Sequence, residues 1–411
     1  MRLPLVFTLI LLIPSILLDW YIYTRIPRKC AVGGHAFDGR RWYAVLSVMT
    51  LLLLVVCICM PKRDAEVSLL PVMWMLYAWS SIYIPKFIYV LIDLFGRLPR
   101  LFKRKAWPSG KLVGLPLAAL LFLAMWWGAI FGRCRIMRTD VEIVSEKVPP
   151  SFDGFRIVQF SDAHVGTWGN DMGFLKEFTD SINALNPDLI LFTGDLVNRH
   201  SDEAYPSVEV LSRLHARYGV YSIMGNHDYG DYANWPDEET HKADVRNLRA
   251  IQEKMGWSVL DNDHTFIKIG NDSIALIGVE NWGEPPFKQY GDLRVAYPHN
   301  ADGHIQDDNF KILLTHNPMH WHEQVRYDTD IDLTLSGHTH AMQMMLGKPG
   351  TGFSLSAWRY PEWGGLYEFR NNRGQLNRLY VNIGCGEVAI PARIGADPEI
   401  TVITLRRGTS E

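Results

Sequence analysis

The sequence predicts an all-α membrane region of about four helices, followed by an α/β domain in which two sheets pack face to face. Four long apolar runs occupy the first third of the 411-residue chain. From Thr139 onward, short β-branched runs alternate with amphipathic stretches, a pattern typical of strands joined by crossover helices. Strands are expected over residues 156–160, 189–192, 220–224, 310–314, 332–335, 378–383 and 399–405, a hairpin around Gly270, and helices over 174–185 and 207–217.

Each apolar run is long enough to cross about 30 Å of hydrocarbon as a helix. The runs cover residues 3–23, 42–60, 69–94 and 112–131. The first could instead be a cleaved signal peptide, but it lacks a small-residue cleavage site, and Arg25, Arg28 and Lys29 follow it. We therefore predict an integral, multi-pass protein of the plasma or inner membrane.

Basic residues between the runs predict an orientation. The first loop holds Arg25, Arg28, Lys29, Arg40 and Arg41, the second Lys62 and Arg63, and the third Arg97, Arg100, Lys103, Arg104, Lys105 and Lys111. Since cytoplasmic loops carry the excess of Lys and Arg, the first and third loops are expected in the cytoplasm. Everything after Phe131 is then extracytoplasmic, although Arg133, Arg135 and Arg138 weigh weakly against this.

Two charged residues, Lys86 and Asp93, interrupt the third apolar run. They are seven residues apart and share a helical face, so they could pair or face the interior of the bundle. An ion or proton path is one interpretation of charge inside a membrane. Snorkelling near a helix end is the other, and we favour it.

Composition excludes some functions. A net charge of −3 provides no basic field for nucleic acid, so nucleic acid is not an expected partner. The five cysteines form no paired framework, and none lies near the His- and Asp-rich blocks described next, so thiolate ligands are not expected. The sequence makes no prediction of the oligomeric state.

Five short blocks rich in His, Asp and Asn recur in the last two-thirds of the chain. They are Asp162-Ala163-His164, Gly194-Asp195, Gly225-Asn226-His227-Asp228, Thr315-His316-Asn317 and Gly337-His338-Thr339-His340. Four follow directly on a β-like run, which places their side chains together at the carboxyl edge of a sheet. Carboxylate and imidazole groups converging there suit two metal ions, and two such ions cleave phosphoesters.

These blocks resemble the ordered signature D-x-H, G-D, G-N-H-[DE], a lone His and G-H-x-H of the calcineurin-like metallophosphoesterase superfamily, over roughly residues 150–405. Residues 152–164 and 397–405 are similar to its membrane-associated bacterial branch, which acts on envelope glycolipids such as UDP-diacylglucosamine. The resemblance implies a four-layer α/β/β/α sandwich over residues 151–411, joined by a junction at 133–150 to a transmembrane domain at 1–132.

The resemblance also implies a site. Asp162, His164 and His340 would hold one metal ion, Asn226, His316 and His338 a second, and Asp195 would bridge them. Mn, Fe or Zn would suit these donors, and a hydroxide between the two ions would attack the phosphoryl group. His227 would act as general acid beside the leaving oxygen, and Asp228 would orient its ring.

The chain departs from the family pattern in two places. Asn198 stands where an acidic residue often follows the bridging Asp, and Ala341 and Met342 replace two glycines, which could narrow the rim of the site. Arg199 and Arg393 are possible phosphate contacts, with surface salt bridges as the favoured alternative.

Three segments between the blocks are expected to be substrate-selecting loops, over residues 229–244, 281–308 and 347–365. They contain Trp235, Trp282, Phe287, Trp358 and Trp363. These aromatic side chains could meet a lipid tail or close small satellite cores, and we favour the second.

The predicted function is a membrane-anchored, binuclear-metal phosphoesterase acting on a phosphodiester, pyrophosphate or phosphomonoester, in a lipid or cell-envelope substrate. One alternative is a membrane sensor or scaffold that uses the same fold to bind a ligand without turnover. Another is a transporter-like membrane domain with an accessory phosphoesterase, which four spans with few polar residues disfavour.

Overall fold

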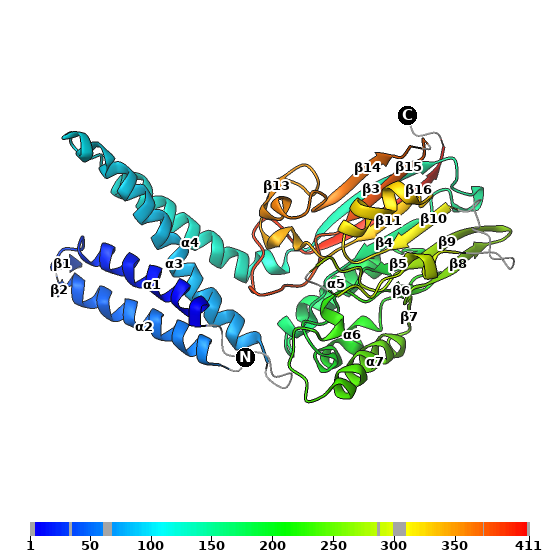
Figure 1. Cartoon of the computed structure of the whole chain (residues 1–411), viewed down its shortest axis with the longest axis horizontal. Helices are drawn as coiled ribbons and strands as arrows, with labels where there is room; N and C mark the ends of the chain where they lie inside the picture. The colour runs from blue at the N-terminus through cyan, green and yellow to red at the C-terminus, as the bar shows by residue number, and fades with distance from the viewer. Residues whose placement is uncertain are drawn as a thin grey trace. The chain divides into compact units, whose positions relative to one another are not determined.

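The computed structural model describes residues 5–32, 35–60, 68–285, 288–298, 310–372 and 374–408 (Figure 1). Lys62, Arg63 and Phe287, which the sequence analysis uses, lie outside these residues. The chain divides into two compact units, residues 1–130 with 389–392, and residues 131–388 with 393–411. We call them the helical unit and the sheet unit and describe each by itself.

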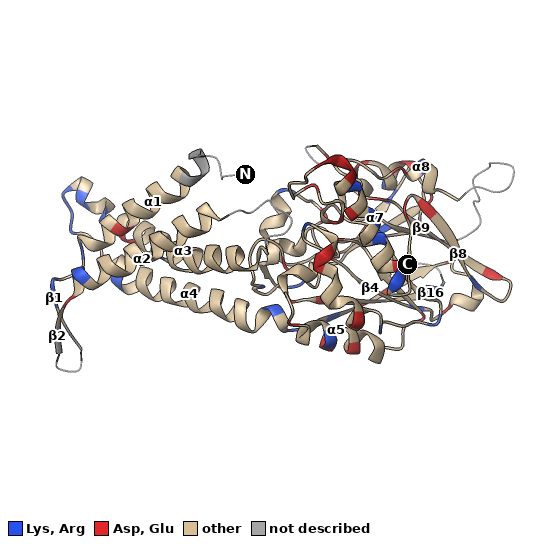
Figure 2. Cartoon of the chain, turned by 90° about the horizontal axis from the view of Figure 1, so that it is seen from below, with Lys and Arg blue, Asp and Glu red and all other residues tan. Residues whose placement is uncertain are grey.

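The helical unit contains one helix for each predicted apolar run. These are α1 (Leu5–Tyr23), α2 (Gly39–Cys59), α3 (Leu70–Arg97) and α4 (Leu115–Ile130), with a short hairpin of β1 (Lys29–Val32) and β2 (His35–Asp38) between α1 and α2. Three apolar helices, Gly39–Cys59, Leu70–Phe102 and Gly110–Cys134, are long enough to span a membrane, and Leu9–Tyr23 is a shorter one. Few residues along these helices are Lys, Arg, Asp or Glu (Figure 2).

Polar side chains cross-link these helices. Asp19 of α1 accepts hydrogen bonds from the hydroxyl groups of Tyr43 (2.7 Å) and Tyr83 (2.5 Å). It also pairs with the Lys86 ammonium at 2.7 Å. Because this ammonium bonds a carboxylate on another helix, the favoured snorkelling interpretation of Lys86 is wrong.

Asp93 is the second acidic group of this unit, and it does not pair with Lys86. Its carboxylate accepts from the Tyr21 hydroxyl at 2.6 Å and from Arg97 at 2.7 Å, and Arg25 approaches it at 3.4 Å. Neutralised acids of this kind favour a structural role in holding α1 to α3 over an ion path.

Removing the Asp19 carboxylate should loosen the helical unit. Asp19→Ala leaves the mostly buried Lys86 without its acid, and we expect the free energy of unfolding to fall by about 3 kcal/mol. The control Asp140→Ala breaks a pair with Arg138 in which both side chains are more than half exposed, and should cost less than about 1 kcal/mol. Denaturation of the full-length chain in detergent, followed by circular dichroism, measures both. Equal losses would contradict a structural role for Asp19.

The sheet unit is built on two six-stranded sheets. One has the order β3-β16-β4-β5-β6-β7 and the other β14-β15-β11-β10-β9-β8. The strands of the first are β3 (Met137–Ser145), β16 (Glu399–Arg407), β4 (Arg156–Phe160), β5 (Leu189–Phe192), β6 (Val220–Ser222) and β7 (Trp257–Val259). Those of the second are β14 (Gly365–Arg370), β15 (Leu376–Val381), β11 (Leu333–Ser336), β10 (Phe310–Leu314), β9 (Asp272–Gly278) and β8 (Asp263–Ile269).

The two sheets pack face to face, which confirms the predicted layers. A buried cluster between them joins Ile157 and Leu191 of one sheet to Leu276 and Ile312 of the other. The outer face of the first sheet packs on α5 (Gly173–Ala184) and α7 (Glu238–Lys254), and that of the second on short helical segments that include α8 (Leu293–Ala296) and Trp321. The result is an α/β/β/α sandwich.

The predicted strands and the Gly270 hairpin appear with ends shifted by at most a few residues. The helix expected over 207–217 is wrong: only α6 (Val208–Leu211) forms, after a 3₁₀ segment that contains Pro206, which has no N–H to donate. Part of the expected loop 229–244 is helical, because α7 begins at Glu238 after the capping Asp237 side chain. The expected junction contains β3, which pairs in parallel with β16.

Candidate metal centre

The five blocks follow strands that run in the same direction. Strands β4, β5 and β6 are parallel and lead to Asp162, Asp195 and Asn226. In the facing sheet β10 and β11 are parallel and lead to His316 and His338. Parallel strands have their carboxyl ends at one edge, so each sheet supplies part of one cluster.

Backbone strain is concentrated in this cluster. Asp162, His164, Asp195, His338 and His340 all have positive φ, between 40° and 75°. For residues with a Cβ this left-handed conformation is costly, and it persists where surrounding contacts impose it. Such strain is typical of functional sites.

Two glycines of the blocks permit a close backbone approach. A Cβ on Gly225 would lie 2.2 Å from Oδ1 of Asp195. A Cβ on Gly337 would lie 2.3 Å from Oδ2 of Asp162. Any larger residue at either position would displace a carboxylate, which explains why glycine stands there.

The predicted donor atoms lie together in overlapping groups. Asp162, His164 and His340 form one group that could hold a metal ion; Asp195, His316 and His338 form a second; and His164, Asp195 and His227 form a third, the donor atoms of each within 4.8 Å of one another. The Asn226 amide oxygen lies 3.0 Å from His316 Nε2, beside the second group. Asp195 belongs to two groups.

Distances within the groups fit a bound cation. His340 Nε2 is 3.1 Å from Asp162 Oδ1, and His316 Nε2 is 3.1 Å from Asp195 Oδ2. His164 Nε2 and His340 Nε2 face each other at 3.2 Å. Two imidazole lone pairs at this distance repel unless a proton or a cation lies between them, and both carboxylates are buried, so the donor set suits divalent ions.

The electrostatics of the cluster point the same way. Burial would raise the pKa of Asp195, but His316 and neighbouring imidazoles outweigh it and hold that pKa well below its usual value. Burial opposes protonation of His316, yet the Asp195 carboxylate raises the pKa of His316 to about 9. Burial and the charge of His316 lower the pKa of His338 to about 3. The carboxylates are thus ionised and His338 is neutral, as metal ligands must be, and His316 would release its proton on binding an ion.

His227 stands beside the first group, with its ring perpendicular to that of His164 at 4.8 Å between centroids. Its Nδ1 lies 2.7 Å from the main-chain carbonyl of Asn198. A carbonyl only accepts, so Nδ1 carries the proton and Nε2 is left to take up or release another. Tyr232 stacks on the ring, at 4.4 Å between centroids.

Asp228 does not orient the His227 ring, and that prediction is wrong. Its carboxylate accepts from the backbone N–H groups of Asp195 (2.8 Å), Leu196 (2.8 Å), Val197 (3.1 Å) and Gly225 (2.9 Å). The carboxylate is therefore committed to the loop that carries Asp195. Burial, reinforced by the Asp195 charge, raises the pKa of Asp228 to about 7.

Sequence reasoning missed two tyrosines. The Asn226 amide donates to the Tyr232 hydroxyl at 2.8 Å, and the Tyr360 hydroxyl lies 2.9 Å from His338 Nε2. The second contact leaves His338 Nδ1 facing His316, at 3.3 Å. Tyr232 follows the third block closely enough to be considered, whereas Tyr360 lies in a distant loop that gives no signal.

The two arginines are buried, so the favoured surface location is wrong for both, although Arg199 does form an ion pair. The buried Arg393 guanidinium donates to the main-chain carbonyls of Ile383, Gly386 and Ala396 and lies 3.3 Å from His340 Nδ1. Arg199 is also buried, with its Nε 3.8 Å from Glu203. Glu203 also accepts from the Asn198 N–H at 2.6 Å, so it places a carboxylate close to the position where the family often has one.

The aromatic residues of the three loop segments have different surroundings. Trp363 is buried, Trp235 stacks on His241, and Trp282 stacks on His320. Trp363 closes a small core, as favoured. Trp358 is 83% exposed and does not. Of the two residues expected to narrow the rim, Ala341 is buried and Met342 is half exposed.

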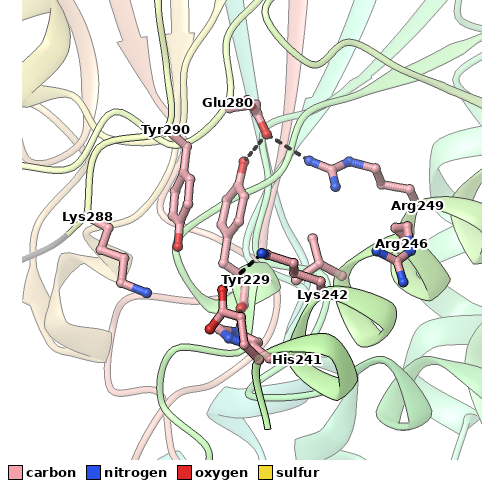
Figure 3. A pocket seen from close by; sticks show the side chains of 10 residues that line it. Tyr229, His241, Lys242, Arg246, Arg249, Glu280, Lys288 and Tyr290 are labelled. Atoms are coloured by element: carbon pink, nitrogen blue, oxygen red, sulfur yellow. Dashed lines mark hydrogen bonds and ion pairs between the residues drawn. The ribbon is translucent and has the colours of Figure 1, made fainter. Parts of the chain in front are cut away.

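A separate cavity of about 420 Å³ lies along α7, between Tyr229, Tyr290 and Glu280 (Figure 3). Its lysines and arginines are each paired with a carboxylate: Lys242 with Glu238, Arg246 with Glu239, Arg249 with Glu280, and Lys288 with Asp231. We assign this cavity no ligand.

Comparison with known families agrees with this site. Residues 155–342 match the family described as calcineurin-like phosphoesterase, and residues 1–133 match the one described as "Probable Calcineurin-like phosphoesterase, transmembrane domain". YkuE of Bacillus subtilis, an uncharacterized metallophosphoesterase, is 32% identical over 281 residues, which cover 66% of this chain and 86% of that protein. The chain therefore belongs to the calcineurin-like phosphoesterases, and it is a phosphoester hydrolase of the membrane.

Two further relatives carry informative names. A transmembrane protein with metallophosphoesterase domain from Danio rerio is 32% identical over 272 residues, covering 65% of this chain but only 57% of that protein. The UDP-2,3-diacylglucosamine pyrophosphatase LpxG of Chlamydia trachomatis is 27% identical over 278 residues, covering 57% of this chain and 78% of that protein.

Loss of the Asp228 carboxylate should destabilise the sheet unit. Asp228→Ala leaves four N–H groups without an acceptor, and we expect a loss of about 3 kcal/mol or more in the free energy of unfolding. The control Asp237→Ala removes an exposed helix cap that accepts one N–H, and should cost much less. Denaturant titration of chelator-treated protein measures both. A variant with wild-type stability would show that Asp228 does not support the loop.

Proposed function

We propose that residues 151–411, which make up most of the sheet unit, form a domain that hydrolyses phosphoesters with two divalent metal ions. Asp162, His164 and His340 hold one ion; Asn226, His316 and His338 hold the other; and Asp195 contacts both. The observation that carries the proposal is that Asp195 falls in one donor group with His164, a ligand of the first ion, and in another with His316 and His338, ligands of the second. When bound, the ions supply positive charge for the phosphoryl oxygens and activate water. Mn, Fe or Zn suits this mixture of donors.

His227 is the proton donor to the leaving oxygen in this proposal. Its Nδ1 is held by the Asn198 carbonyl, so the ring keeps its orientation while Nε2 gains or loses a proton. The stacked Tyr232 restricts the ring from one side. Asp228 contributes by stabilising the loop that carries Asp195, from whose backbone N–H groups it accepts hydrogen bonds.

The substrate we propose is a lipid or cell-envelope phosphoester: a phosphodiester, a pyrophosphate or a phosphomonoester. Two observations support it. The chain has an N-terminal domain matching a transmembrane family, and a relative is named as a pyrophosphatase of UDP-2,3-diacylglucosamine. Basic residues are concentrated in the loops between α1 and α2 and between α3 and α4. This favours a multi-pass helical unit with these loops in the cytoplasm and the sheet unit outside it.

Substitutions at Asp195 and His227 separate metal binding from proton transfer. His227→Ala should retain both ions and lose about 10²–10⁴-fold in turnover, because only the proton donor is removed. Asp195→Asn should lose metal and turnover together, because a neutral amide is a poor ligand to two cations. Elemental analysis gives metal per chain, and hydrolysis of bis-p-nitrophenyl phosphate with added Mn, Zn or Fe gives turnover. The exposed His215→Ala is the control.

The outcomes distinguish the phosphoesterase proposal from the sensor or scaffold alternative. Two ions per chain with no turnover of any mono-, di- or pyrophosphoester would favour a sensor or scaffold. One ion per chain with full turnover would contradict the binuclear arrangement. Unchanged turnover in His227→Ala would exclude that residue as the acid.

Cysteine labelling tests the orientation. Tyr327→Cys places a thiol at an exposed position of the sheet unit, in a chain whose Cys30, Cys59 and Cys134 are replaced by alanine. A membrane-impermeant maleimide should react with intact cells if the sheet unit is extracytoplasmic. Reaction only after lysis would place it in the cytoplasm.

A further inference from the structure

Exposed apolar side chains gather on one short segment of the sheet unit. Its members are Met342 (51% exposed), Met344 (38%), Leu346 (73%), Phe353 (55%) and Trp358 (83%), and we call them the apolar face. In the rest of the described chain beyond Gly132, the large apolar side chains with comparable exposure are four, and they are scattered: Tyr205, Val295, Tyr327 and Leu366. Clusters of this kind mark interaction surfaces.

The apolar face is built by strand geometry. Met344 and Leu346 are exposed on either side of buried Met345 in extended backbone, so these two point to one side. Met342 is exposed in the left-handed turn that precedes them. β12 (Met345–Leu346) pairs antiparallel with β13 (Phe353–Ser354), and Leu346 stands directly opposite Phe353. Opposed residues of a strand pair present their side chains on the same face.

The inner side of this hairpin is firmly anchored. Met345 packs in a buried cluster with Trp363 and Ile383. The Gln343 amide oxygen accepts from the Val388 N–H at 2.7 Å, and the Ser354 hydroxyl donates to the Ala341 carbonyl at 2.6 Å. The outward direction of the apolar face is therefore fixed by packing.

The charges around the apolar face suit a lipid surface. Residues 341–361 contain no Asp or Glu, and their charged residues are Lys348 and Arg359, in a chain whose net charge is −3. Arg359 pairs with Glu284 of another loop. Apolar side chains with Trp and a few cations are the composition of segments that rest in the head-group region of a bilayer. Basic residues are attracted there by anionic lipids.

The covalent chain keeps such a surface within reach. Helix α4 ends at Ile130 and β3 begins at Met137, so the intervening residues 131–136 can extend over at most about 25 Å. The sheet unit is thus tethered beside the membrane that holds the helices, and lipid is the apolar partner at highest local concentration.

The apolar face also adjoins the candidate metal centre. Met342 is two residues from His340, and the Tyr360 hydroxyl that contacts His338 follows Trp358 by two residues. Between them the Thr339 hydroxyl donates to the Trp363 carbonyl at 2.6 Å. One segment therefore carries ligands of the proposed centre and the apolar face.

We propose that the apolar face inserts into the head-group region of the bilayer in which the chain is anchored. Insertion holds this rim of the metal centre at the lipid surface. Phosphoesters of lipid head groups then reach the centre without leaving the membrane, and this consequence rests on the proposed function. Insertion itself does not depend on turnover.

Depth measurement tests the proposal on the full-length chain. A spin label is attached at Phe353→Cys, with Cys30, Cys59 and Cys134 replaced by alanine, in nanodiscs of phosphatidylcholine and phosphatidylglycerol. A label in lipid is relaxed more by oxygen than by a water-soluble nickel complex. We expect oxygen to dominate at position 353 and nickel to dominate at the control Tyr327→Cys, an exposed aromatic position outside the apolar face.

Two results would overturn the proposal. Nickel dominating at both positions would place the apolar face in water. Shielding of the 353 label from both reagents, with broadening between labels, would show that a second copy of the chain covers it.

A second variant tests the cause of insertion. With the label at 353, Leu346→Ser and Trp358→Ser together should shift the accessibility toward nickel, while the label at 327 is unchanged. An unshifted label would contradict insertion through the apolar face. Because no arm measures hydrolysis, failure here is distinct from failure of the phosphoesterase proposal.

Discussion

The parallel direction of the inner strands in two facing sheets is the constraint on which the site depends. Buried residues such as Leu191 and Ile312 hold the sheets together, and this packing brings the ends of β4, β5 and β6 against those of β10 and β11. The Gln159 amide donates to the Ser336 carbonyl at 2.9 Å, which links the two sheets. Both residues lie near the strand ends that carry the donors. Donors from distant parts of the chain meet because the two sheets pack against each other.

Without bound ions, the cluster of donors lowers the stability of the folded protein. Its carboxylates are buried, and five of its donor-bearing residues adopt left-handed backbone conformations. The Asp228 carboxylate offsets part of this cost by accepting four N–H groups around Asp195, and imidazoles balance the remaining charge. Bound divalent ions would neutralise the buried carboxylates. This gives the strained backbone a functional reason.

The helical unit and the hairpin of the apolar face solve the opposite problem of placing polar and apolar groups against lipid. Inside the helical unit, Asp19 bonds Lys86 of another helix, and Asp93 bonds Tyr21 of another helix and Arg97 of its own, so both carboxylates have partners. On the hairpin, side chains that a soluble protein would bury point away from an anchored core. Both arrangements are energetically favourable only beside a membrane.

The sequence by itself determined the strands, the order of the blocks and the family, because these depend on local periodicity and on contiguous residues. Strands β4 and β5 and the Gly270 hairpin were predictable in this way, and so was the set of donors at the strand ends. Helix α7 and strand β3 were missed, since α7 is mostly polar and β3 is an edge strand whose residues are mostly half-buried or exposed in alternation.

Only the tertiary structure decided which partner each polar group takes. Lys86 bonds Asp19, 67 residues away, and Tyr360 reaches His338 from a loop. The carbonyl of Asn198, not the carboxylate of Asp228, holds the His227 ring. The exposure of Trp358 and the burial of Arg393 could not be predicted from the sequence either. Such contacts depend on the packing of segments distant in the chain, and a single sequence carries no local signal for that packing.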